Sequence, residues 1–173
     1  MNKKIIIVGG SGSGKDYLLK QLISRGLKYS PKFTSRPRRS EEVDGVNYNF
    51  ITNDEFNSLN ENNEIKVYQL FNIRGSLWSY GISKQNFDEN EVFIMTPHEI
   101  KMLNEEDLSK SFIVYLDIDE DIRKERISSR NDNNDDVQRR IDADNRDFEG
   151  FDCFNARIDN PNFYCDDIYN MVY

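Results

Sequence analysis

Continuous apolar runs alternate with helical patterns along this chain, an order typical of an α/β fold. Runs without polar alternation predict strands that are buried on both faces, as in a parallel sheet. The first run ends in glycines, and each later run is followed by a polar helical pattern. These runs are Lys3–Val8, Glu91–Met95 (EVFIM) and Ser111–Leu116 (SFIVYL). The pattern therefore predicts a parallel sheet with crossover helices.

Helical spacing is clearest directly after the first strand. From Gly14 onward, Leu18, Leu19, Leu22 and Ile23 recur at helical intervals, and Arg25-Gly26 marks the end of that helix. Near the C-terminus, 156–158 predicts a last short strand. A terminal helix is predicted over 163–172, with three residues facing inward: Phe163, Ile168 and Met171.

Two segments differ from this core pattern. Residues 30–80 cluster aromatic and basic side chains around turns, and 122–147 is highly charged with an Asn/Asp-rich patch at 131–136. The first is typical of an inserted substrate lobe and the second of a lid. At 173 residues the chain predicts one domain. Its expected parts are a core (1–30, 83–120 and 148–173), a lobe (31–82) and a lid (121–147).

Bulk composition narrows the class of partner. Hydrophobic residues make up 37% and charged residues 31%, as in globular proteins, and the net charge is -8. This acidity argues against nucleic acid or an anionic membrane as a partner, because both need an extended basic face. No run is long enough for a membrane span and no signal peptide is evident, so a cytoplasmic protein is expected. Cys153 and Cys165 lack metal-ligand spacing and are expected to be reduced.

The glycine-rich stretch GGSGSGKD, from Gly9 to Asp16, carries the clearest chemistry. Between a strand and a helix, GxxxxGK binds nucleotide phosphates through backbone N–H groups, the helix N-terminus and the lysine. A plain glycine-rich turn is the alternative. The residues expected to bind ATP are Gly10, Ser11, Gly12, Ser13, Gly14, Lys15 and Asp16.

Asp16 stands where such loops normally carry Ser or Thr, whose hydroxyl ligates Mg²⁺. A carboxylate is also a suitable Mg²⁺ ligand, so Asp16 is a candidate metal ligand, with Mg²⁺ as the expected cofactor of ATP. The simpler interpretation is a helix N-terminal carboxylate that the helix dipole favours.

A second motif, TSRPRRSEEVDGVNYNF from Thr34 to Phe50, clusters arginines around a proline. Arginines with a tyrosine suit a bidentate grip on a phosphate, although a solvated basic loop is the alternative. This segment resembles guanylate kinases, which carry TTRxPRxGEVxGxxYxF. The matching residues are Arg36, Arg39, Glu42, Val43, Gly45, Tyr48 and Phe50.

The resemblance implies a P-loop core with a nucleoside-monophosphate lobe and a lid, and ATP-dependent phosphorylation of GMP or dGMP. It implies that Arg36, Arg39, Tyr48 and Tyr80 hold the monophosphate and that Asn160 lies at the ATP site. Lid arginines would neutralise the transferred phosphoryl group. With Lys15, the expected catalytic residues are Arg126, Arg130 and Arg139. For Arg123, Arg140 and Arg146, a solvated position on a helix is an equal alternative.

Base recognition departs from the family. Lys32 stands where guanylate kinases carry a hydroxyl residue, and Val67 where they carry a Glu. Ile82 or Ser83 stands at their Ser or Thr, and His98 at their Asp. The base pocket is therefore expected around Lys32, Val67 and His98, without the carboxylate that binds guanine. Arg74 or Trp78 could enter it, although packing is the simpler role for Trp78, and a helix start for His98.

The strand end IMTPH also lacks the family's Asp pair, and Asp16 could replace the missing carboxylate. In this the chain resembles ribose 1,5-bisphosphate phosphokinase, which joins a GSGKD loop to such a strand end. Asp117 also ends a strand, but a metal role there is not implied.

Three functions follow from these motifs. The first is an ATP-dependent nucleoside-monophosphate kinase whose base differs from guanine, with guanylate kinase proper as its alternative. The second is a non-catalytic phosphopeptide-binding module, which would not need Lys15. The third is a sugar-phosphate kinase. ATP and a nucleoside monophosphate are the expected partners of a monomer or homodimer.

Overall fold

A four-stranded parallel sheet forms the core of this computed structural model, in which residues 3–129 and 137–173 are described. The strand order is β6-β1-β7-β8, and every neighbouring pair runs parallel. The predicted parallel sheet is confirmed. Its strands are β1 (Lys4–Gly9), β6 (Val92–Ile94), β7 (Ser111–Leu116) and β8 (Ala156–Ile158).

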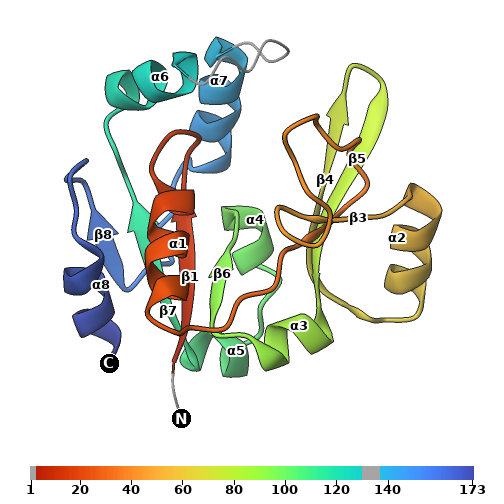
Figure 1. Ribbon diagram of the computed structural model, residues 1–173, viewed down its shortest axis with the longest axis horizontal. Coiled ribbons are helices and arrows are strands. Elements are labelled where there is room, and N and C mark those ends of the chain that lie inside the picture. Colours follow the sequence, from red (N-terminus) through yellow and green to blue (C-terminus); the bar gives the residue numbers. More distant parts are fainter. Residues whose placement is uncertain (1–2, 130–136) are drawn as a thin grey trace.

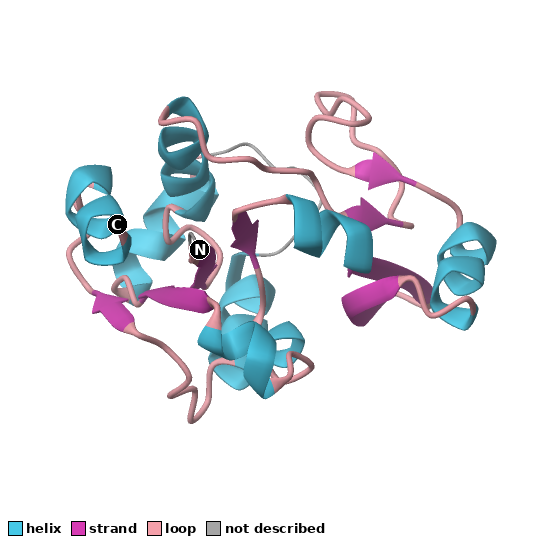
Figure 2. Ribbon diagram, turned by 90° about the horizontal axis from the view of Figure 1, so that it is seen from below, coloured by secondary structure: helices cyan, strands magenta, loops and turns pink. Residues whose placement is uncertain are grey.

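Helices cover both faces of this sheet (Figure 2). Ile5 and Ile7 of β1 pack in a cluster with α1 and α8, whereas Ile6 and Val8 face a second cluster that includes side chains of α3 and α4. Burial on both faces explains why β1 has a continuous apolar run. The helices are α1 (Lys15–Ser24), α3 (Lys84–Glu89), α4 (Pro97–Ile100), α5 (Glu105–Ser109) and α8 (Cys165–Val172).

The terminal helix α8 corrects one prediction. Ile168 is buried and Phe163 packs against the first cluster, but Met171 is 50% exposed. The buried stripe starts at Cys165 and continues through Ile168, Tyr169 and Val172, the i, i+3, i+4, i+7 pattern of one helix face. Met171 lies off that stripe, so the prediction that it faces inward is wrong.

The lobe has its own mixed sheet, of order β3-β2-β5-β4, and stands beside the core (Figure 1). A two-residue turn joins β4 and β5 at Arg74-Gly75, and both residues have positive φ, 51° and 84°, as a type I′ hairpin turn requires. Arg74 therefore lies at the tip of this hairpin. The lobe elements are β2 (Phe33–Thr34), β3 (Asn49–Phe50), α2 (Asn53–Glu61), β4 (Ile65–Ile73) and β5 (Ser76–Ser83).

Two helices lie at the end of the core sheet where β1 runs into the phosphate loop, α6 (Glu120–Ser128) and α7 (Val137–Asp147) (Figure 1). They contact each other and occupy the segment predicted as a lid. Arg130, expected to be catalytic, lies outside the described residues. Both cysteines are free thiols. No helix of the described ranges is both long and apolar enough to cross a membrane.

Candidate active site

The phosphate loop connects the end of β1 to the start of α1. Gly12 and Gly14 have φ of 76° and 100°, values that glycine adopts without strain. The Lys15 Nζ atom donates hydrogen bonds to the carbonyl oxygens of Gly9 (2.7 Å) and Gly10 (2.8 Å), so the ammonium group lies directly on the loop. A strand, a turn of glycines and a helix N-terminus thus form the expected anion-binding arrangement.

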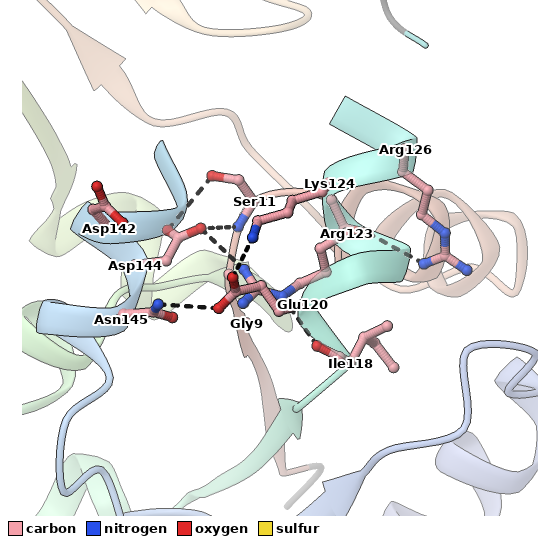
Figure 3. A network of polar contacts seen from close by, with 12 residues as sticks. Gly9, Ser11, Ile118, Glu120, Arg123, Lys124, Arg126, Asp142, Asp144 and Asn145 are labelled. Atoms are coloured by element: carbon pink, nitrogen blue, oxygen red, sulfur yellow. Dashed lines mark hydrogen bonds and ion pairs between the residues drawn. The ribbon is translucent and has the colours of Figure 1, made fainter. Parts of the chain in front are cut away.

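Helix α6 brings two arginines to this loop (Figure 3). The Arg123 side chain is largely buried, and its Nε atom donates to the carbonyl of Ile118 at 3.0 Å. A Cβ atom at Gly10 would crowd the end of the Arg123 side chain, so a larger residue there would displace this guanidinium. Arg126 donates to the Gly12 carbonyl at 3.2 Å. The sequence leaves open whether Arg123 is solvated, and the structure shows that it is buried.

The spacing along α6 could have revealed this burial. Arg123 and Ile127 are four residues apart, so they share one helix face, and both are buried. A charged residue on the buried face of α6 indicates a polar partner beneath it. The partner is the phosphate loop together with Asp144.

Of the other residues expected at the ATP site or in catalysis, Arg126 contacts the loop, whereas Asn160 and Arg139 have exposed side chains. Arg126 also donates to the carbonyl of Pro161 at 3.0 Å, which links the loop to the segment that carries Asn160. The Asn160 side chain is exposed and accepts a hydrogen bond from the Asn162 backbone. Arg139 lies on α7 with an exposed side chain. The structure therefore brings Lys15 and Arg126 together at the loop.

An acidic residue that the sequence did not single out occupies part of the loop. The Asp144 Oδ2 atom, from α7, accepts a hydrogen bond from the Ser11 backbone N–H at 2.7 Å and lies 3.3 Å from Arg123 Nη1 (Figure 3). Backbone N–H groups of such a loop are the ones that bind phosphate oxygens. The Asp144 carboxylate therefore stands where an anionic ligand would compete with it.

We expect Asp144→Asn to bind ATP about tenfold more tightly than the wild type, because one charged hydrogen bond no longer has to be broken. Titration calorimetry with ATP measures this. The control is Asp142→Asn, the same change at an exposed position of α7. Unchanged or weaker ATP binding by the Asp144 variant would show that ATP does not displace this carboxylate.

The lobe gathers three of the residues expected to hold a monophosphate. Arg36 Nε donates to the Tyr80 hydroxyl at 3.2 Å, and the guanidinium lies 5.4 Å from the Tyr48 ring. The rings of Tyr48 and Tyr80 meet edge to face with centroids 5.8 Å apart. Burial, with the nearby Tyr80 hydroxyl, raises the pKa of the Tyr48 hydroxyl well above its usual value. Tyr48 is therefore protonated at neutral pH and can donate to a phosphate.

A carboxylate orients this arginine. Glu42 accepts from Arg36 Nη1 at 3.0 Å and Nη2 at 2.7 Å, and from the Arg39 backbone N–H at 2.9 Å. Burial alone would raise the pKa of Glu42, but the Arg36 and Arg39 hydrogen bonds lower it below the ordinary 4.5. The Glu42 carboxylate thus fixes the orientation of the Arg36 guanidinium, and the exposed Arg39 side chain projects from the same turn.

The residues expected around the base have three different environments. Lys32 Nζ pairs with both oxygens of Glu99, at 2.6 and 2.7 Å, and Glu99 is fully buried. Val67 has no exposed surface and packs in the second core cluster with Ile82. His98 is exposed in the first turn of α4. Val67 therefore offers no surface to a base in this conformation.

Asp16 lies exposed in the first turn of α1, beside the loop. Burial and then the Asp16 charge raise the pKa of Tyr29 to about 12, and the Asp16 charge also contributes to the raised pKa of Tyr48. The described part of the chain holds no group of three or more metal-ligating side chains. A single carboxylate still fits Mg²⁺, which commonly takes one or two carboxylates plus substrate phosphates. Asp117 is paired with Arg157 at 2.5 Å.

Comparison with known proteins gives consistent matches. The sequence matches the family described as guanylate kinase over residues 1–172. The guanylate kinase of Mesoplasma florum is 34% identical over 148 residues, covering 81% of this chain and 49% of that protein. That of Mycoplasma mycoides is 43% identical over 72 residues, covering 40% and 24%. The chain thus spans half or less of the length of these curated relatives.

One solved structure has the same fold. The crystal structure of guanylate kinase from Anaplasma phagocytophilum superposes with a TM-score of 0.69 at 16% identity, over 98% of this chain and 84% of that one. The match includes the α/β core predicted from the sequence.

Proposed function

We propose that this chain, which belongs to the guanylate kinase family, transfers the γ-phosphoryl group of ATP to a nucleoside monophosphate. The observation that carries this proposal is the presence of two phosphate-binding arrangements in one domain. Lys15 lies on a glycine loop, and the Arg36, Tyr48 and Tyr80 cluster lies in the lobe. A phosphopeptide-binding module would need only the second.

Each group has a definite part in the proposed reaction. Lys15 and Arg126 supply positive charge beside the ATP phosphates, where charge develops during phosphoryl transfer. Arg36 and Tyr48 hold the acceptor phosphate, with Arg39 exposed nearby for the same anion. Closure of α6 and α7 over the loop would exclude water that otherwise hydrolyses ATP. Arg130 and Arg139 remain proposed contributors from the lid.

The base of the monophosphate is proposed to differ from guanine. Val67 and Ile82 form an apolar pair, directly opposite each other on β4 and β5. In guanylate kinases, the two corresponding positions carry residues that recognise guanine. An apolar pair cannot satisfy the donors of the guanine edge. Guanine, read by other groups, is the alternative.

Measuring ADP release from ATP and Mg²⁺ across a panel of ribo- and deoxyribonucleoside monophosphates tests the function. Strong turnover with one monophosphate is expected, and ribose 1,5-bisphosphate is the control substrate. Turnover confined to GMP or dGMP would contradict the proposed base but not the kinase. Absence of ADP release with every monophosphate of the panel would contradict the proposed kinase activity.

Asp16 is the proposed Mg²⁺ ligand, because it is the carboxylate that follows Lys15 in the loop. Mg²⁺ would there neutralise phosphate charge. We expect Asp16→Ala to raise the Mg²⁺ concentration needed for half-maximal turnover about tenfold, by loss of a charged ligand. The Mg²⁺ dependence of Tyr17→Phe, an exposed neighbour, serves as the control. An unchanged Mg²⁺ requirement in Asp16→Ala would mean that Asp16 is only a helix-terminal carboxylate.

A further inference from the structure

Two buried side-chain atoms within the described residues lack a hydrogen-bond partner, Ser13 Oγ and Gln69 Oε1. Ser13 belongs to the phosphate loop, whereas Gln69 lies on β4 in the lobe and has no role in the site described above. Buried polar atoms are nearly always paired, so an unpaired one in a binding protein calls for an explanation. A ligand that supplies the missing donor is one such explanation, provided that neighbouring side chains move to admit it, because the Gln69 Oε1 atom is buried in this conformation.

Strand register places Gln69 on the side of the lobe sheet that carries the monophosphate residues. Gln69 pairs directly with Tyr80 across β4 and β5, and Tyr80 pairs with Thr34 of β2. Residues directly opposite each other in an antiparallel pair point to the same face. Gln69 therefore lies beside Tyr80, whose hydroxyl accepts from Arg36.

The next row on this face offers no polar group to a base. Val67 and Ile82 pair with each other, are 0% and 4% exposed, and pack against core side chains such as Ile100. Gln69 is in the same row as Tyr80, so it lies nearer to the contact between Arg36 and Tyr80 than the apolar row does. Gln69 is thus the polar side chain of β4 that shares the face of Tyr80 and lies next to it.

We propose that the Gln69 carboxamide reads the base of the monophosphate, with Oε1 accepting an N–H of the base edge. The inference rests on the proposed function and adds its specificity residue. A carboxamide offers one acceptor and one donor, whereas a carboxylate offers two acceptors. Gln69 therefore matches a base edge with one N–H donor beside one acceptor, and it cannot accept both the N1–H and the amino group of guanine, as a carboxylate can.

Binding and turnover with the nucleotide panel test this residue in three forms of the protein, wild type, Gln69→Leu and Gln69→Glu. We expect Gln69→Leu to reduce the preference between the best and the other monophosphates about tenfold, through loss of one base hydrogen bond, with ATP affinity unchanged. Gln69→Glu should shift the preference toward GMP. The matched control is Gln85→Leu at an exposed position of α3, which should alter neither.

Calorimetric affinities separate this inference from the proposed function. Monophosphate binding with a Gln69-dependent base preference, but without turnover, would contradict the kinase and support the role of Gln69. Turnover with the same preference in wild type and Gln69→Leu would overturn the role of Gln69 and leave the kinase standing. Absence of binding, or binding without base preference, would also overturn it. If Gln69→Leu does not fold, Gln69→Asn, which shortens the reach but keeps the polarity, gives the same comparison.

Discussion

Replacing Lys15 with methionine is expected to lower kcat for phosphoryl transfer by about 10²–10³-fold, the usual cost of removing one group that stabilises transition-state charge. The Nζ atom lies on the Gly9 and Gly10 carbonyls, at the loop that we propose to bind the ATP phosphates. Methionine keeps an unbranched, flexible side chain that is one atom shorter, and it removes the charge and the hydrogen-bond donors. A coupled assay of ADP release with the preferred monophosphate measures the loss.

The matched control for this change is Lys20→Met, since Lys20 lies exposed on the same helix α1. It should leave kcat within a factor of two of the wild type. Thermal unfolding of both variants shows that the fold is retained. If Lys15→Met kept more than a tenth of the wild-type kcat, this lysine would not act on the transferred phosphoryl group.

Arg36→Ala is expected to have two large effects, one on stability and one on substrate binding. The Arg36 and Glu42 side chains are only 6% and 14% exposed, so removing the arginine leaves a carboxylate largely buried without its partner. Breaking a buried pair in this way costs about 3–5 kcal/mol of the free energy of unfolding. KM for the monophosphate should rise at least about tenfold, because a charged phosphate contact is lost.

A double variant separates the two effects. In Arg36→Ala combined with Glu42→Gln, the uncompensated charge is gone, so much of the stability should return, whereas the raised KM should remain. Denaturant unfolding and steady-state kinetics measure the two quantities. Arg38→Ala, at an exposed neighbouring position, is the control for charge near the site. Recovery of the monophosphate KM in the double variant would mean that Arg36 acts only by supporting the lobe.

Much of the core could be predicted because its signals are local. The continuous run of β7 ends at Leu116 in the structure as in the prediction, and β8 covers the predicted residues 156–158. Burial on both sheet faces requires such runs, so their residues carry the information by themselves. Met171 shows where such local signals fail. Helical spacing predicts that α8 has a buried face, but the packing of α8 on the core decides which residues form it.

Long-range contacts could not be predicted in the same way. Asp144 reaches Ser11 across 133 residues, and Lys32 reaches Glu99 across 67. No pattern near Asp144 indicates that it lies on the phosphate loop, because the contact depends on how α6 and α7 pack over that loop. For the same reason, the sequence does not distinguish a solvated Arg123 from a buried one.

By itself, the sequence determined the parallel core, the phosphate loop with Lys15 and the cluster of basic residues around Arg36, since each depends on residues adjacent in the chain. The tertiary structure alone decided that Val67 and Ile82 are buried as a pair, that Gln69 shares the face of Tyr80, and that Asp144 occupies a loop N–H. Register between strands and packing between distant helices set these positions, and both depend on the whole fold rather than on any one segment.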